Sequence, residues 1–163
     1  MDDVTSNQMA DKEMKDVWIF QAKFGHLLNH EPCHLTKRKL LERLECMQEE
    51  LDEFREAVVA QDLAAQADAL IDLVYFAKGT ANMLGLTYIW KDLWNEVQRA
   101  NMDKVPGITK RGHRVDVTKP QGWKPPQLEK ILEENDYHPE NFMADKSCSI
   151  LERLCFDDER EEG

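Results

Sequence analysis

The stretch from Ala67 to Ala77 constrains the fold more than any other part of the chain, because nine of its eleven residues are apolar. The two exceptions, Asp68 and Asp72, lie one helical turn apart. A helix that is apolar all round is normally buried, and a buried carboxylate needs a cation, a metal ion or a proton. No Lys or Arg precedes Lys78 in the helix predicted from about Leu63 to Leu84. The two aspartates are therefore candidates for a functional site.

A second carboxylate-rich segment, "EELDEF" at residues 49–54, lies on the preceding predicted helix. Thr36 is the expected N-cap of that helix. At about 100° per residue, Glu50 and Glu53 lie on one flank of the apolar stripe, with Glu49 beside them. Asp52 falls on the other side and is interpreted as a surface charge. The apolar stripe consists of Leu40, Leu44, Met47, Leu51, Phe54 and Val58.

The two carboxylate flanks converge if the second and third helices pack face to face. Glu50, Glu53, Asp68 and Asp72 would then share one acidic pocket, with Glu49 nearby. Carboxylate oxygens in that number suit Mg²⁺ or Mn²⁺. Such ions would explain why like charges are crowded into this segment.

The remaining pattern predicts an all-α helical bundle with about four core helices. Apolar residues at helical spacing predict a first helix from about Val17 to Leu28, which Pro32 stops. A fourth helix is expected over about 86–97, after Gly85 ends the third. Residues 110–120 suggest a short hairpin that turns near residues 111–112.

Composition and charge limit the class of protein. A chain of 163 residues with 42% apolar residues can form one sizeable core. The net charge of -11 disfavours nucleic acid as a partner. No stretch approaches the roughly 18 apolar residues of a membrane span, and the first residues lack the pattern of a signal peptide. We therefore expect a cytoplasmic protein without a membrane partner, with its four cysteines reduced.

One basic segment interrupts this acidic chain. Residues 104–124 contain six Lys or Arg and one acid, whereas residues 127–163 contain twelve acids and four bases. The basic segment is either a solvated loop or the place where an anion binds. The predicted domain covers residues 1–126, including a basic arm at 104–126. Residues 127–163 form an acidic C-terminal extension that is expected to be partly disordered.

Two other metal sites fit the sequence poorly. A di-iron bundle needs Glu-x-x-His pairs on facing helices, and neither carboxylate helix contains a histidine. A zinc site in "HEPCH", at residues 30–34, lacks a second pair of ligands at the spacing of a zinc finger.

Four segments together resemble a known family. They are "EELDE", "ADALIDLVYFAKGTA", "VQRANMDK" and "KPQGWKPP", in that order, and they look like the MazG-like all-α nucleoside triphosphate pyrophosphohydrolases in the form found in many bacteriophages. The resemblance covers roughly residues 14–130. The family motif E-E-x-x-E is matched by Glu49, Glu50 and Glu53, and Asp72 matches the Asp of its E-x-x-D motif. Ala69 stands where the Glu of the second motif would be, and Asp68 is the expected substitute.

The resemblance also implies roles for the basic segment and for assembly. Asn101 and Lys104 match the family's phosphate-contacting positions, and Lys119 would belong to an arm over the triphosphate. Members are commonly homodimers or homotetramers with sites built between subunits. Aromatic groups, among them Trp94, could wall a base pocket, although core packing is the alternative.

The expected function is metal-dependent hydrolysis of a nucleoside triphosphate to a nucleoside monophosphate and pyrophosphate. Two or three Mg²⁺ or Mn²⁺ ions would be held by Glu50, Glu53, Asp68 and Asp72, and Glu49 or Glu50 would accept a proton from water. The first candidates are dGTP and GTP, because the phage-type members include guanine-nucleotide enzymes; a phage-encoded enzyme would act in the host cytoplasm. The alternatives are dUTP or dCTP, phosphoribosyl-ATP, an alarmone, or a non-catalytic oligomerisation module.

Overall fold

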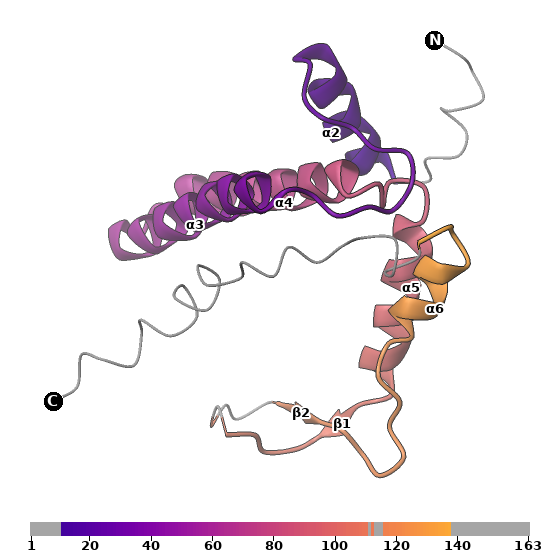
Figure 1. The fold of residues 1–163 in the computed structure, drawn as a ribbon. Helices are drawn as coiled ribbons and strands as arrows, with labels where there is room; N and C mark the ends of the chain where they lie inside the picture. Colours follow the sequence, from indigo (N-terminus) through magenta and orange to yellow (C-terminus); the bar gives the residue numbers. More distant parts are fainter. Residues whose placement is uncertain (1–10, 111, 113–115, 138–163) are drawn as a thin grey trace, which may run out of the picture.

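The protein is helical apart from one short sheet, which confirms the predicted all-α class. The computed structural model describes residues 11–110, 112 and 116–137, and Figure 1 shows their arrangement. The helices are α2 (Lys12–Lys23), α3 (Lys37–Ala60), α4 (Leu63–Met83), α5 (Trp90–Met102) and α6 (Leu128–Glu133). The strands are β1 (Val105–Pro106) and β2 (Val117–Thr118), which pair antiparallel.

α3 and α4 form a long helical hairpin that carries both carboxylate segments (Figure 1). Thr36 caps α3 as predicted, since its side chain accepts a hydrogen bond from the Lys39 amide at 3.3 Å. The chain reverses at Gln61, which adopts a left-handed conformation with φ 56°. The Asp62 side chain then caps α4 by accepting from the amides of Ala64 and Ala65. The two carboxylate helices therefore pack side by side, antiparallel.

α2 packs on α4 through a buried polar network. The Gln21 side chain donates to the Gly79 carbonyl at 3.0 Å. Asn82, which is fully buried, donates to the Gln21 side chain and accepts from the Thr87 hydroxyl. Because these buried groups are satisfied, they fix α2 against α4 without a large desolvation cost.

α2 ends earlier than the sequence predicted. Its last residue is Lys23, and Gly25 follows with φ 68°. The Gly25 amide donates to the Ala22 carbonyl and the His26 amide donates to the Gln21 carbonyl, the pattern of a Schellman C-cap. The prediction that the helix continues to Leu28 was therefore wrong, because the glycine closes the helix first.

α5 runs away from the α3/α4 hairpin instead of packing along it (Figure 1). The short α6, at the start of the C-terminal extension, packs on α5. The rest of that extension, residues 138–163, lies outside the described residues, and the predicted domain boundary at 126 stays a prediction. Within the described part of the chain, no helix is long and apolar enough to cross a membrane.

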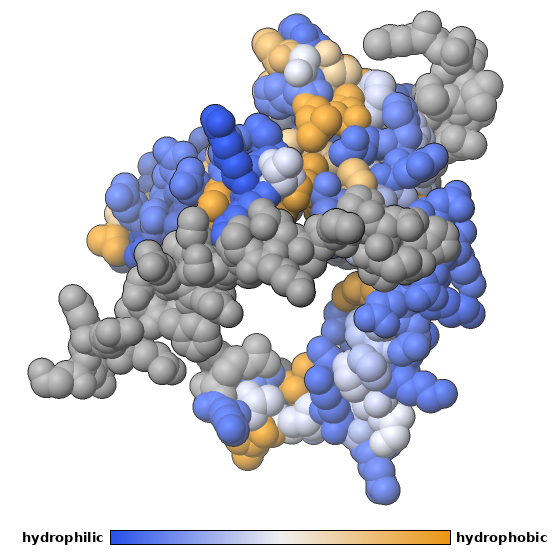
Figure 2. Space-filling model, in the orientation of Figure 1, coloured by the Kyte–Doolittle hydropathy of each residue, from blue (hydrophilic) through white to orange (hydrophobic). Residues whose placement is uncertain are grey.

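Much of the apolar surface of the hairpin is exposed among the residues that the structure describes. The prediction that α4 is buried all round was wrong for the single chain, because Leu70 is 47% exposed, Ile71 64% and Val74 43%. Leu44, Leu51 and Val58 on α3 are similarly exposed. Figure 2 shows hydrophobic residues at the surface of the hairpin, of α2 and of the arm. Exposed apolar area on this scale marks an interaction surface.

The hairpin of the arm begins earlier than the predicted residues 110–120. β1 starts at Val105, and β2 lies inside the predicted hairpin of residues 110–120. The expected turn near residues 111–112 includes residue 111, which lies outside the described part of the chain. Gly107 is required where it stands, because a Cβ there would come within 2.7 Å of the Thr118 side chain.

Candidate active site

Glu50 is the most buried carboxylate of the proposed site. The residue is only 8% exposed, and its Oε2 atom has no hydrogen-bond partner among the described residues. Burial raises the pKa of Glu50, and neighbouring negative charges raise it further. In decreasing order of effect, these charges belong to Glu53, Asp72, Glu49 and Asp68. Four carboxylates from α3 and α4 therefore act electrostatically on Glu50.

The two aspartates of α4 are exposed, in contrast to the expectation from the sequence. The residue of α4 that is buried at this level is Ala69, which is 3% exposed. Successive helical residues differ in direction by about 100°, so the exposed Asp68 lies on a different side of α4 from the buried Ala69. The buried carboxylate is therefore contributed by α3, through Glu50, while Asp68 and Asp72 lie at the solvent-facing side of the same region.

The carboxylates are close enough to interact but do not form a closed metal cage. Within the described ranges, no group of three or more His, Cys, Asp or Glu side chains is positioned to hold one metal ion. Carboxylates without a cation repel one another, which favours separated side chains. The donor set is nevertheless one of hard oxygen ligands, and the Oε2 atom of Glu50 is a buried acceptor without a donor. Both properties fit Mg²⁺ or Mn²⁺.

Basic side chains do not neutralise this cluster. In the part of the chain that the structure describes, none of its five carboxylates forms an ion pair. Arg43 on α3 donates instead to the Thr80 hydroxyl at 3.0 Å and to the Phe76 carbonyl at 2.9 Å. Arg55 pairs with Asp52, in agreement with the interpretation of Asp52 as a surface charge. The acidic cluster therefore carries uncompensated charge.

An aromatic group adjoins the cluster. The rings of Phe20 and Tyr75 meet edge to face with their centres 5.4 Å apart, and the ring centres of Phe20 and Phe24 are 4.7 Å apart. Phe20 is 41% exposed and Phe24 56%. Burial raises the pKa of Tyr75, and the charges of Asp16 and Asp72 raise it further, so this ring lies near the acidic cluster.

Sequence reasoning missed Phe20 and Tyr75 as candidate site residues. The position of Tyr75 three residues after Asp72 was the available signal, because residues three apart share a helix face.

The predicted phosphate-binding residues lie at the other end of the molecule. Asn101 is near the end of α5, and its side-chain oxygen accepts from Lys104 Nζ at 2.8 Å. Lys119 Nζ lies 4.5 Å from the centre of the Trp123 ring. Because α5 runs away from the hairpin (Figure 1), one chain does not bring these residues to the carboxylates.

Trp94 is also remote from the carboxylates in the same chain. It is 62% exposed and lines a pocket of about 660 Å³ together with Trp90, Val74 and Ala77. Val74 and Asp72 lie about 200° apart around α4, so this pocket opens on a different side of the helix from the carboxylate cluster. Its size alone therefore does not make it the active site.

One comparison identifies the family of the chain. Residues 17–101, more than half of the 163 residues, match the family model described as phosphoribosyl-ATP pyrophosphohydrolase. The matched region includes α3, α4 and nearly all of α5, and with them the carboxylate cluster. A comparison with curated proteins finds no match. The chain therefore belongs to the phosphoribosyl-ATP pyrophosphohydrolase family, a group of MazG-like all-α nucleotide pyrophosphohydrolases that act on pyrophosphate bonds.

Proposed function

We propose that the protein is a metal-dependent nucleoside triphosphate pyrophosphohydrolase, which converts a (d)NTP and water to a (d)NMP and pyrophosphate. The observation that carries the proposal is the buried Glu50 carboxylate, which has an oxygen without a partner and four neighbouring acids. In a pyrophosphohydrolase family, such an uncompensated cluster of hard oxygen donors fits divalent cations better than a structural role.

Glu50, Glu53, Asp68 and Asp72 are the proposed ligands of two or three Mg²⁺ or Mn²⁺ ions. Bound ions would supply the positive charge that orients the phosphates and would acidify the attacking water. Support comes from the absence of Lys or Arg partners for these acids among the described residues. Glu49 or Glu50 would accept the proton of the water, since general bases of this kind must lie within hydrogen-bond reach of it.

Asn101, Lys104 and Lys119 are the proposed partners of the phosphates that leave as pyrophosphate. In this acidic protein, a triphosphate needs nearby cationic and hydrogen-bonding groups to be held. The two lysines belong to the basic segment of residues 104–124, which contains six Lys or Arg and one acid. Because α5 and the arm run away from the hairpin of their own chain, they would meet the carboxylates of a second copy.

A homodimer or homotetramer is therefore part of the proposal. The apolar residues Leu70, Ile71 and Val74 on α4, and Trp94 and Val97 on α5, are all more than a third exposed. Val74 of α4 and Trp94 of α5 line the same pocket, so the exposed apolar residues of these two helices adjoin each other there. Burying such a surface against a second copy would supply the hydrophobic stabilisation that the small core of one chain lacks.

The substrate base is proposed to stack on the exposed aromatic group of Phe20, Phe24 and Tyr75, which adjoins the carboxylates through Asp72. The resemblance to phage-type enzymes makes dGTP and GTP the first candidates. Phosphoribosyl-ATP is the second candidate, because the matching family model carries its name. Both reactions break the bond between the α- and β-phosphates, so the same metal site serves either.

The test is a panel of purified nucleotides incubated with the protein and Mg²⁺ or Mn²⁺. It contains the common (d)NTPs, phosphoribosyl-ATP and an alarmone, and both products are measured. We expect metal-dependent release of pyrophosphate with guanine nucleotides turned over fastest. Preference for phosphoribosyl-ATP would select the second candidate. If no nucleotide is turned over with either metal, the chain is better explained as a non-catalytic oligomerisation module.

A further inference from the structure

Two lysines, Lys104 and Lys119, directly flank the paired residues of the arm. Val105 on β1 is paired with Thr118 on β2. Continued one position beyond the paired residues, this antiparallel register would set Lys104 opposite Lys119, two residues after α5 ends at Met102. Like charges that face each other across antiparallel strands are destabilising. The arm therefore holds an arrangement that an anion between the two ammonium groups would stabilise.

Both ammonium groups are held by neutral partners. Lys104 Nζ donates to the Asn101 side-chain oxygen at 2.8 Å, and Lys119 Nζ lies 4.5 Å from the centre of the Trp123 ring. Neither partner removes the positive charge, although each restricts where the ammonium lies. Among the residues that the structure describes, neither lysine forms an ion pair with a carboxylate.

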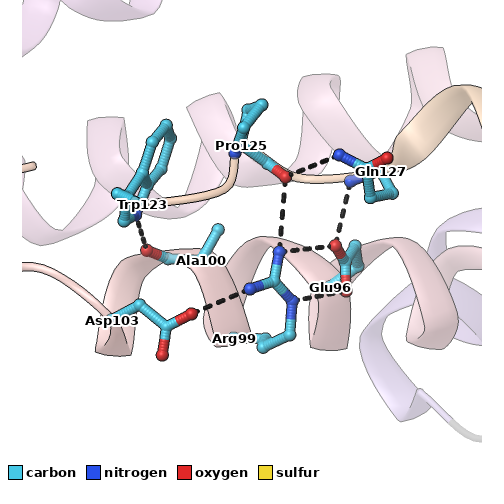
Figure 3. Close-up of polar contacts among 7 residues, drawn as sticks. All are labelled: Glu96, Arg99, Ala100, Asp103, Trp123, Pro125 and Gln127. Atoms are coloured by element: carbon cyan, nitrogen blue, oxygen red, sulfur yellow. Dashed lines mark hydrogen bonds and ion pairs between the residues drawn. The ribbon is translucent and has the colours of Figure 1, made fainter. Parts of the chain in front are cut away.

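Nearby acids are engaged by Arg99. Figure 3 shows its guanidinium bridging Glu96, bound through two nitrogens at 2.8 and 2.9 Å, and Asp103 at 2.8 Å. The hydrogen bonds from Arg99, followed by that from the Gln127 amide, lower the pKa of Glu96 to about 2. Arg99 thus binds both acids near the C-terminal end of α5 and offsets part of their charge. Lys104 and Lys119 have no carboxylate partner among the described residues, so both keep their positive charge.

The returning end of the arm is fastened to α5. The indole N–H of Trp123 donates to the Ala100 carbonyl at 2.7 Å (Figure 3). This carbonyl belongs to the last turn of α5, where carbonyls have no partner within the helix. The ring that holds Lys119 is therefore itself fixed to α5, the helix that Lys104 follows after two residues.

A second fastening follows directly. The Gln127 amide donates to a carboxylate oxygen of Glu96 at 2.9 Å, and the Pro125 carbonyl accepts from Arg99 at 3.3 Å. The segment from Trp123 to Gln127 thus runs back along α5 (Figure 3). Fixing both ends of a loop lowers the entropy that it loses when its tip binds a ligand.

Within the pyrophosphate-binding group proposed above, where Lys104 and Lys119 act as a two-cation clamp, we propose that Trp123 is the positioning residue that sets Lys119 in this clamp. The proposal rests on the proposed function and adds a residue outside the family's matched region, which ends at residue 101. Two ammonium groups on one pyrophosphate make charge-assisted hydrogen bonds, which are stronger than neutral ones. Trp123 touches neither substrate nor metal and acts only through Lys119.

The experiment measures binding of inorganic pyrophosphate to the intact protein by calorimetry, in the presence of Mg²⁺. Lys119→Gln should weaken binding roughly tenfold or more, because it removes a charged donor. Trp123→Phe keeps a ring beneath Lys119 but removes the N–H that fixes it to Ala100, and it should weaken binding by about three- to tenfold. Lys110→Gln, which removes an exposed charge elsewhere on the same arm, is the matched control and should change binding less than about twofold.

A double-mutant cycle separates positioning from a merely structural role. If Trp123 acts through Lys119, adding Trp123→Phe to Lys119→Gln should weaken binding no further. Additive losses, or a Lys119→Gln effect no larger than that of Lys110→Gln, would overturn the clamp. In steady-state assays both variants should raise KM and leave kcat within about twofold. The circular dichroism and melting temperature of Trp123→Phe, compared with the wild type, show whether the fold is retained.

Pyrophosphate binding does not depend on turnover, so the two proposals can fail separately. If no nucleotide is hydrolysed but the cycle shows full coupling, the clamp stands and the proposed function fails. If nucleotides are hydrolysed and the cycle is additive, the function stands and the clamp is wrong.

Discussion

Glu50 on α3 and Asp72 on α4 repel each other across the helical hairpin. The negative charge of Asp72 is one of the causes that raise the pKa of Glu50, after burial and the charge of Glu53. A raised pKa means that the folded protein binds this proton more tightly than the unfolded chain does. Glu50 therefore stabilises the fold below its ordinary pKa of 4.5 and loses that contribution as the pH rises through its raised value.

Glu50→Gln should accordingly stabilise the metal-free protein at pH 7. We expect the melting temperature to rise by about 2–4 °C, a typical response of a chain of this size to a modest gain. The gain should shrink toward pH 4, where Glu50 itself becomes protonated. Adding Mg²⁺ should stabilise the wild type more than the variant. A variant that melts no higher than the wild type in the metal chelator EDTA would show that the cluster is not strained by repulsion.

Glu53→Gln and Asp72→Asn should each remove turnover while preserving the fold. Loss of a ligand to the ions that orient the phosphates should reduce kcat by about 100-fold or more. Asp52→Asn is the control, because Asp52 lies next to Glu53 on α3 but pairs with Arg55. Activity and circular dichroism should be measured together. Full activity in Asp72→Asn would mean that the metal site has been assigned to the wrong residues.

Most of the fold could be predicted from the sequence because its signals are local. The Thr36 cap and the apolar periodicity of residues 63–84 depend only on neighbours along the chain, and both predicted their helices correctly. The end of α2 was missed because Gly25 closed that helix inside a continuing apolar pattern. The spacing of apolar residues predicts that a helix forms, but it does not predict the residue at which a C-cap ends that helix.

The candidate site could be predicted only in part, because it depends on how helices face each other. Helical angles indicated the Glu50 flank, and the charges that act on Glu50 are those of Glu49, Glu53, Asp68 and Asp72. The same reasoning expected a buried α4, whereas Ile71 is 64% exposed in the single chain. An apolar pattern shows that a surface is to be covered, and it does not show whether the same chain covers it.

That exposed surface gives a test of assembly. If the proposed oligomer forms, Ile71→Glu should convert it to monomer, because the variant places a charge in the apolar face formed with Leu70 and Val74. Val59→Glu is the control: Val59 is 81% exposed and lies on the side of α3 turned away from α4. Sedimentation velocity of both variants and the wild type gives the mass directly. A wild type that is monomeric at micromolar concentration would contradict the assembly.

A site shared between two chains predicts complementation. Asp72→Asn should be inactive alone, and Lys104→Gln should lose most of its activity at substrate concentrations below KM. Co-expressed as a mixture, they should recover about a quarter of wild-type activity in a dimer, since half of the dimers are mixed and each mixed dimer has one intact site. Continued inactivity of the mixture, with exchange of subunits verified by two affinity tags, would place both residues in one chain's site.

The last prediction concerns which bond breaks. A triphosphate held by ions at the carboxylates and by Lys104 and Lys119 at its β- and γ-phosphates presents its α-phosphorus to the attacking water. Attack there expels pyrophosphate in one step, so nucleoside monophosphate and pyrophosphate should form in equal amounts without a diphosphate intermediate. In water labelled with ¹⁸O, mass spectrometry should find the label in the monophosphate. Label in the pyrophosphate would mean attack at the β-phosphorus. Diphosphate and orthophosphate as first products would mean attack at the γ-phosphorus, and either result would reverse the proposed placement of the triphosphate.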